Sequence, residues 1–304
     1  MKKYLWLMPT MLCIYTFIYS LTHLTTINQI TQSTLAAIFQ LIPSLFFLMF
    51  LFGVMNQMGL FGLAGFFLEK ILNPLLHLGT RASGLYAASL FAGYPTFALL
   101  IGQAYERQEI DAAEMKHLMR ISSHASPAFV LLSIGSGLFH SLKMGLVIWL
   151  IHILSNLILA LIFRPASPGK KLSWESCLEG CASTAFVPLC QRQLIQCVRT
   201  FVYIYGFMLI FNVLLASLFS HLPGSAIFHG LLEFSAGSLD LANQPERSIF
   251  VLVSLFLGFS GISCMMQVQA VLSHIQWSFQ SYFIARFFQG LIAFLLSIFY
   301  LWLS

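Results

Sequence analysis

The stretch Ser89-Leu90-Phe91-Ala92-Gly93-Tyr94-Pro95 lies in the middle of an apolar run, residues 83–105, and decides how that run can fold. A glycine and a proline this close together end one helix and begin another. Each half then has about ten residues, too few to cross a hydrocarbon layer about 30 Å thick. The stretch therefore predicts a re-entrant hairpin or a broken helix at membrane depth.

A second stretch of similar sequence interrupts a later apolar run, residues 248–273. It reads Ser254-Leu255-Phe256-Leu257-Gly258-Phe259, and the interruption includes Gly261. The flanks match as well. A glutamate precedes each glycine by 24 or 25 residues and a glutamine follows it by ten or nine, namely Glu69, Gln103, Glu233 and Gln267. The match indicates an internal repeat, although Gly93, Gly258 and Gly261 would also let helices pack closely.

The composition places the chain in a lipid bilayer. Of its 304 residues, 59% are apolar and 8% are charged, whereas a soluble domain carries roughly 25% charged residues. At about 20 residues per spanning helix, the length accommodates roughly eight to ten membrane segments. A multi-pass protein of the cell membrane is expected, and an ordinary cytosolic enzyme or a nucleic-acid-binding protein is excluded.

The order of apolar runs and connectors predicts four parts. Residues 1–56 form N-terminal transmembrane helices, and residues 57–163 form the first repeat, which contains two expected spanning helices at 121–139 and 144–163. Residues 164–198 form a cytoplasmic loop, and residues 199–304 form the second repeat. The predicted fold is an all-α polytopic membrane protein with two inverted repeats, each carrying a re-entrant or broken helix.

The distribution of basic residues gives the orientation. If both interrupted segments re-enter from the side they left, twelve of the fifteen Lys and Arg residues fall on the side of the N-terminus, which is the cytoplasmic side by the positive-inside rule. Three spans then separate the two copies, so the copies face opposite sides. Inverted repeats with interrupted helices are typical of transporters, since the N-terminus of a half-helix can hold an anion and must line a cavity.

Several ordered stretches together resemble a known family: residues 91–95, the acidic helix after them, Ser123–Phe129 with His124 and Pro127, His152 with Asn156, and residues 257–263. The family is that of sporulation integral membrane proteins with a nucleoside-recognition, or gate, domain. The resemblance implies an architecture similar to concentrative nucleoside transporters. It also implies movement of dipicolinic acid during spore formation, in the outer forespore membrane if the organism forms spores. Two departures are a shorter central loop and Ser260 in place of the usual glycine.

The candidate site residues are those at the interruptions, together with polar groups at membrane depth. The expected substrate-binding set is Gly93, Tyr94, Pro95, Ser123, Ser126, Pro127, Glu233, Gly258, Gly261, Gln267 and Arg286. Arg286 is expected either to hold a substrate carboxylate as a two-point fork or to pair with Glu233. The candidate coupling groups are Glu69, His124, His152 and Asn156. Glu69 has the alternative of an interfacial position beside Lys70, and each histidine that of a bond to neighbouring backbone.

Transport of a small anionic solute, dipicolinic acid in particular, is the favoured function. The alternatives are transport of a nucleoside-like solute and a non-transporting assembly subunit of a sporulation membrane complex. An enzyme is not expected, because no HExxH or GxSxG motif occurs. No cofactor or metal is expected, since the loop cysteines lack a CxxC pair. The expected partners are the solute and the bilayer but no nucleic acid, and a homo-oligomer is compatible with the sequence.

Overall fold

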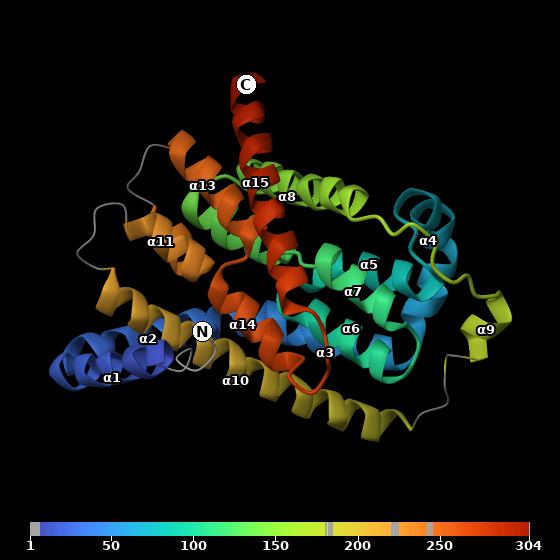
Figure 1. Ribbon diagram of the computed structural model, residues 1–304, viewed down its shortest axis with the longest axis horizontal. Helices are drawn as coiled ribbons and strands as arrows, with labels where there is room; N and C mark the ends of the chain where they lie inside the picture. Colours follow the sequence, from blue (N-terminus) through green and yellow to red (C-terminus); the bar gives the residue numbers. More distant parts are fainter. Residues whose placement is uncertain (1–6, 180, 182–184, 220–224, 242–245, 304) are drawn as a thin grey trace.

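The computed structural model describes residues 7–179, 181, 185–219, 225–241 and 246–303, and within these ranges every regular element is a helix (Figure 1). The elements of the first half are α1 (Leu7–Thr22), α2 (Leu24–Leu41), the π-helix η2 (Ile42–Phe46), α3 (Phe47–Gln57), α4 (Leu60–Leu76), α5 (Thr80–Ala92), α6 (Thr96–Glu106), α7 (Ala112–Ile121), the π-helix η3 (Phe129–Leu138) and α8 (Leu142–Ile162). The elements of the second half are α9 (Trp174–Glu179), α10 (Phe186–Leu218), α11 (Ser225–Leu232), α12 (Phe234–Asp240), α13 (Glu246–Phe259), α14 (Ile262–Val271) and α15 (Phe279–Leu303).

Fewer helices are long enough to cross a membrane than the roughly eight to ten expected. In the described part of the chain, four spans pass by length and apolarity: α8, α10, α13 with α14, and α15. The number rises to six if the bent pairs α1–α2 and α3–α4 each count as one span. The difference arises because much of the apolar sequence lies in half-helices such as α5, α6 and η3, which are too short to span alone.

Large apolar side chains cover the outside of these helices. Phe17, Leu146, Val202 and Phe299 are exposed, and they belong to α1, α8, α10 and α15. A water-facing surface would not carry so continuous an apolar covering. The chain is therefore a multi-pass membrane protein, with these faces turned to lipid.

The first interruption is a re-entrant hairpin. α5 ends at Ala92 and α6 begins at Thr96. The outer ends of the two helices are tied together, because Arg81 at the start of α5 pairs with Glu109 just beyond α6, at 2.6 Å. The chain thus turns back at Gly93-Tyr94-Pro95, as the sequence predicted.

The second interruption, at Ser260 and Gly261, is a broken span rather than a hairpin. Phe250 near the start of α13 contacts Tyr300 of α15, and Phe259 at the end of α13 contacts Phe283, so α13 runs antiparallel to α15. His274, just after α14, lies 2.8 Å from Glu106 at the outer end of the first hairpin. The expectation that both segments re-enter is therefore wrong for the second. The count of basic residues is unaffected, because none lies between Arg247 and Arg286.

The expected spanning helix over residues 121–139 is replaced by two different structures. α7 ends at Ile121, residues 122–126 are non-helical, with 122–125 buried, and η3 follows. Pro127 explains the change, since a proline disfavours helix in the residue before it but is well placed in a first helical turn.

The expected cytoplasmic loop over residues 164–198 is shorter than predicted. α10 already begins at Phe186 and runs for 33 residues. Leu189, Gln193 and Cys197 are buried at four-residue spacing, the pattern of a helix with one packed face. The helical start was not predicted because the charges of Arg192 and Arg199 made this stretch resemble a loop.

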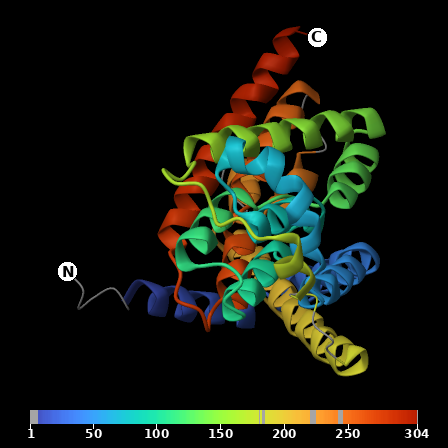
Figure 2. The same cartoon turned by 90° about the vertical axis from the view of Figure 1, so that its right-hand side faces the viewer.

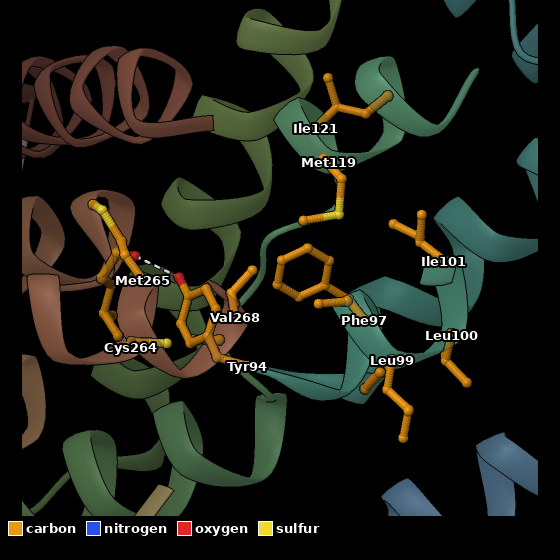
Figure 3. Close-up of a cluster of buried hydrophobic side chains, with 14 of the residues drawn as sticks. Tyr94, Phe97, Leu99, Leu100, Ile101, Met119, Ile121, Cys264, Met265 and Val268 are labelled. Carbon is orange, nitrogen blue, oxygen red and sulfur yellow. Dashed lines mark hydrogen bonds between the residues drawn. The ribbon is translucent and has the colours of Figure 1, made fainter. Parts of the chain in front are cut away.

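A cluster of buried apolar side chains lies where α6, α7 and α14 meet (Figure 3). Phe97 and Leu100 of α6, Met119 of α7, and Met265 and Val268 of α14 are almost inaccessible. Figure 1 and Figure 2 both show the C-terminal end of α15 projecting beyond the other helices. The interruptions of the chain are thus held inside the packed region, while the ends of long helices extend outward.

Cysteine labelling tests this topology. In a background whose own exposed thiols are replaced, Lys170→Cys and His274→Cys should react with an impermeant maleimide from the cytoplasmic side only, and Glu246→Cys from the opposite side only. All three positions are exposed. Reaction of His274→Cys on the same side as Glu246→Cys would show that α13 and α14 form a hairpin and contradict the broken span.

Candidate functional site

Four interruptions of the helices converge on one small cavity of about 60 Å³. They are the hairpin tip at Tyr94, the non-helical stretch ending at Ser126, the joint between α11 and α12 at Glu233, and the break before α14. The cavity is lined by Leu45, Tyr94, Ala125, Ser126, Phe129, Ile204, Met208, Glu233, Phe234, Ser235, Cys264 and Gln267. The structure therefore brings together Tyr94, Ser126, Glu233 and Gln267, all predicted from the sequence.

Tyr94 ties the first interruption to the second. Its hydroxyl donates a 2.7 Å hydrogen bond to the carbonyl of Leu257, drawn as a dashed line in Figure 3. That carbonyl lies in the last turn of α13, where the helix has no further N–H to offer. Gly93 has φ of 72° and no room for a side chain, since a Cβ would lie 2.8 Å from Cβ of Ser126. The tip is thus packed against the non-helical stretch and bonded to the broken span.

The joint at Glu233 lies between two short helices that cross closely. A Cβ on Gly237 of α12 would come within 2.2 Å of the Gly230 Cα in α11, and a Cβ on Gly230 would come within 2.0 Å of the Phe256 ring. The Glu233 side chain is 1% exposed and accepts a 2.6 Å hydrogen bond from the Ser235 hydroxyl. The backbone of Phe234 lies against Gly261, at 3.0 Å from where a Cβ would be. Glu233 is thereby held beside the start of α14.

Arg286 supports the non-helical stretch rather than the cavity. Its guanidinium donates to the carbonyl of Ser123 at 2.9 Å, and also to the carbonyl of Arg120 and to Oε1 of Gln289. Of the described residues that line the cavity, none is basic. The role of a two-point fork for a bound carboxylate, expected for Arg286, does not fit this position. The side chain instead supplies donors to carbonyls that the end of α7 leaves unpaired.

Two more side chains complete the support of residues 122–126. His152 of α8 accepts a hydrogen bond from the backbone N–H of Ala125 through Nε2, at 3.0 Å. The hydroxyls of Ser123 and Tyr282 are 3.0 Å apart. Backbone bonding was the alternative for this histidine, and the structure places His152 in that role. Ser123 accordingly lies behind the cavity wall rather than on it.

The candidate coupling groups fall into two places, both away from the cavity wall. His124 lies with its ring centroid 5.8 Å from that of His152, and Asn156 bonds Gln289 and the hydroxyl of Tyr86, each at 3.3 Å. Glu69 lies elsewhere, where it accepts a bond from Thr80 and is 4.0 Å from the Lys171 ammonium. Glu69 is thus buried and engaged by neighbouring polar groups, apart from the cavity.

The remaining predicted residues are structural, and three polar partners were missed. A Cβ at Gly258 would lie 2.7 Å from the Gly290 Cα, so this glycine allows α13 to pack on α15. Pro95 and Pro127 begin helices and do not line the cavity. Ser235, Tyr86 and Gln289 were not predicted. Their sequence positions carried a signal, because polar residues close to a buried charged residue share its environment. Ser235 is two residues after Glu233, and Gln289 is one helical turn after Arg286.

Comparison with known proteins gives one informative similarity. The chain is 23% identical over 294 residues to the sporulation integral membrane protein YlbJ of Bacillus subtilis (strain 168), an alignment that covers 83% of this chain and 71% of the relative. No family model matches the chain, and no solved structure matches it significantly. The similarity supports a family of sporulation membrane proteins and a multi-pass location.

Loss of Arg286 should destabilise the fold. In Arg286→Gln the carbonyls of Arg120 and Ser123 lose their donors while buried, which costs about 3 kcal/mol or more. Thermal unfolding in detergent should therefore show a clear fall in melting temperature, whereas Arg247→Gln, which removes an exposed charge, should not. If Glu233→Gln is as costly as Arg286→Gln and the double variant is no worse, the two side chains act as a pair and the backbone role is wrong.

Proposed function

We propose that this chain transports a small solute across the membrane, and that the cavity at the four interruptions is its binding site. The observation that carries the proposal is their convergence. Backbone that leaves a helix at membrane depth is tolerated only where it is bonded by protein or lines a cavity. Here Tyr94, Ser126 and Glu233 come from three separate interruptions, and they line one cavity together with Gln267 of α14, the helix that follows the fourth. Transporters build their sites in this way, from discontinuous helices near the middle of the bilayer.

The cavity is closed in this conformation. A volume of about 60 Å³ holds a few water molecules, whereas ligand pockets usually exceed about 300 Å³. Ile204 and Met208 of α10 cover the cavity from one direction, while Phe234 covers it beside Glu233. On this proposal, displacement of α10 or of the α11–α12 hairpin opens the cavity to the solute.

The lining suits a small aromatic carboxylic acid, and dipicolinic acid is the solute we propose. Three aromatic rings form one wall: Phe234 has its centroid 5.8 Å from that of Tyr94 and 5.3 Å from that of Phe129. Rings at such distances offer faces and edges to a flat solute. The hydroxyl of Ser126 and the amide of Gln267 supply donors for carboxylate oxygens. The similarity to a sporulation membrane protein favours a solute of spore formation.

Glu233 has a consequence for the transported species. A carboxylate solute in a small closed cavity meets the like charge of the Glu233 carboxylate, and two such charges in contact are strongly unfavourable. We therefore propose that a proton enters with the solute and is shared between its carboxylate and Glu233. Transport of the acid would then be coupled to the proton gradient.

A nucleoside-like solute is the second candidate. The same amide, hydroxyl and carboxylate groups would bond a neutral heterocycle without any proton, and the aromatic wall would stack on it. The two candidates differ in charge, so competition between them separates them. Neither requires a catalysed reaction, a cofactor or a nucleic acid.

Uptake by proteoliposomes tests the proposal. The protein should accumulate labelled dipicolinate, and Gln267→Ala should raise its KM about tenfold or more, because a hydrogen bond to a charged group contributes about 1.5–3 kcal/mol. Ser136→Ala, an exposed serine away from the cavity, is the matched control. If labelled uridine accumulates and dipicolinate does not, the nucleoside-like solute is correct. If neither exceeds empty liposomes, the transport proposal fails.

A further inference from the structure

A second, larger cavity opens beside the binding cavity. It has a volume of about 570 Å³, lies between α6, α10 and α14, and is lined by Gln103, Glu106, Arg107, Arg192, Arg199 and His274, among others. Lys170 and Arg81 lie on the same side of the molecule as Glu106, since Arg81 pairs with Glu109 and the N–H of Thr80 bonds the carbonyl of Lys170. By the positive-inside rule, this vestibule faces the cytoplasm.

The charge of the vestibule is positive and only partly neutralised. Arg107 is paired with Glu109 at 3.1 Å, and Glu106 is engaged by His274. Arg192 and Arg199 are exposed, and in the parts of the chain that the structure describes no carboxylate lies within salt-bridge distance of either. They are seven residues apart on α10, two helical turns, so both are on one face of the helix. Two guanidinium groups therefore border this cavity without an acidic partner.

The inner end of the vestibule is a network of neutral amides. Gln193 accepts hydrogen bonds from Gln57 at 2.8 Å and from Gln103 at 3.1 Å, and Asn56 donates to Gln103 at 3.1 Å. These amides carry no charge, so they do not compete with an incoming anion for the arginines.

The vestibule adjoins the binding cavity along two shared helices. On α10, Tyr203 lines the vestibule and the next residue, Ile204, lines the binding cavity. On α14, Ala270 lines the vestibule and Gln267, one turn earlier, lines the binding cavity. Along α10, Arg199 is five residues and Arg192 is twelve residues before Ile204, so the two arginines lead along one helix toward the binding cavity.

We propose that Arg192 and Arg199 form an anion-binding vestibule, which collects small dicarboxylates on the cytoplasmic face and delivers them to the binding cavity. The assignment of a delivery role rests on the proposed function of that cavity. Guanidinium groups suit it because their planar donors match carboxylates two by two. A cavity lined by one sign of charge also raises the local concentration of the opposite ion. Positive-inside anchoring alone would not need the arginines to border a cavity.

Charge-selective labelling tests the vestibule without any transport. Ser273 is exposed and lines the vestibule, and Ser273→Cys is introduced where Cys13, Cys181 and Cys190 are replaced by serine. The quantity measured is the ratio of the reaction rate with an anionic methanethiosulfonate to the rate with a cationic one, at low ionic strength. This ratio should be about fivefold or more higher with both arginines present than in the double variant Arg192→Gln with Arg199→Gln. Arg192→Lys with Arg199→Lys should keep most of the preference, and Lys116→Gln, an exposed cation outside the vestibule, should keep all of it. An unchanged ratio in the double glutamine variant overturns the proposal.

Transport by inverted vesicles, which present the cytoplasmic face to the medium, tests the delivery role. The double glutamine variant should raise the KM for dipicolinate about fivefold with little change in kcat, and its KM should lose most of its dependence on salt. An unchanged KM and an unchanged salt dependence overturn delivery. If the labelling preference depends on the two arginines but dipicolinate is not carried at all, the anion site stands and the proposed substrate is the part that fails.

Discussion

Every interruption of a helix inside a membrane leaves backbone donors and acceptors that lipid cannot satisfy, and this constraint organises the whole molecule. Arg286 shows most clearly how such backbone groups are satisfied by a side chain. Its guanidinium lies in the interior, 0% exposed, with bonds to the carbonyls of Arg120 and Ser123, where α7 gives way to non-helical chain. A buried charge would be costly if it met only apolar groups. Here the carbonyls need donors and the two terminal nitrogens of the guanidinium need acceptors, so they bond one another.

At the other interruptions, too, a polar side chain bonds the backbone groups that the helices leave unpaired. Tyr94 bonds the end of α13, and His152 bonds the N–H of Ala125. Because these supports lie behind the interruptions, the side chains in front of them, Ser126, Glu233 and Gln267, are left to face a shared cavity. Removing the supports would collapse the cavity, whereas changing the cavity lining leaves the fold in place. Residues that support the backbone and residues that face the cavity thus lie side by side, and Tyr94 belongs to both sets.

Sequence patterns predicted the parts of this arrangement that are local. Glycine and proline mark the interruptions at Gly93 and Gly261 wherever they occur, because the backbone conformation they allow does not depend on neighbours. Partners distant in the sequence could not be predicted in the same way. Arg286 was visible as an unusual charge, but its bonds to α7 depend on how α15 packs. The helical start of α10 was not predicted because Arg192 and Arg199 made an exposed helical face resemble a charged loop. That α13 and α14 together form one span is visible only from contacts such as that of His274 with Glu106, which are distant in the sequence.

The central claim is that the closed cavity opens to admit a solute, and Cys264 provides a native reporter of it. This thiol is 1% exposed and lines the cavity, whereas Cys197 is 0% exposed and does not. With the other cysteines replaced, each thiol is kept alone and treated with a small impermeant thiosulfonate from each side of sealed vesicles, with and without dipicolinate. The account predicts that Cys264 reacts from both sides, that dipicolinate slows the reaction, and that Cys197 stays unreactive. If Cys264 is as unreactive as Cys197 from both sides, the cavity is a sealed packing defect and the transport account is wrong.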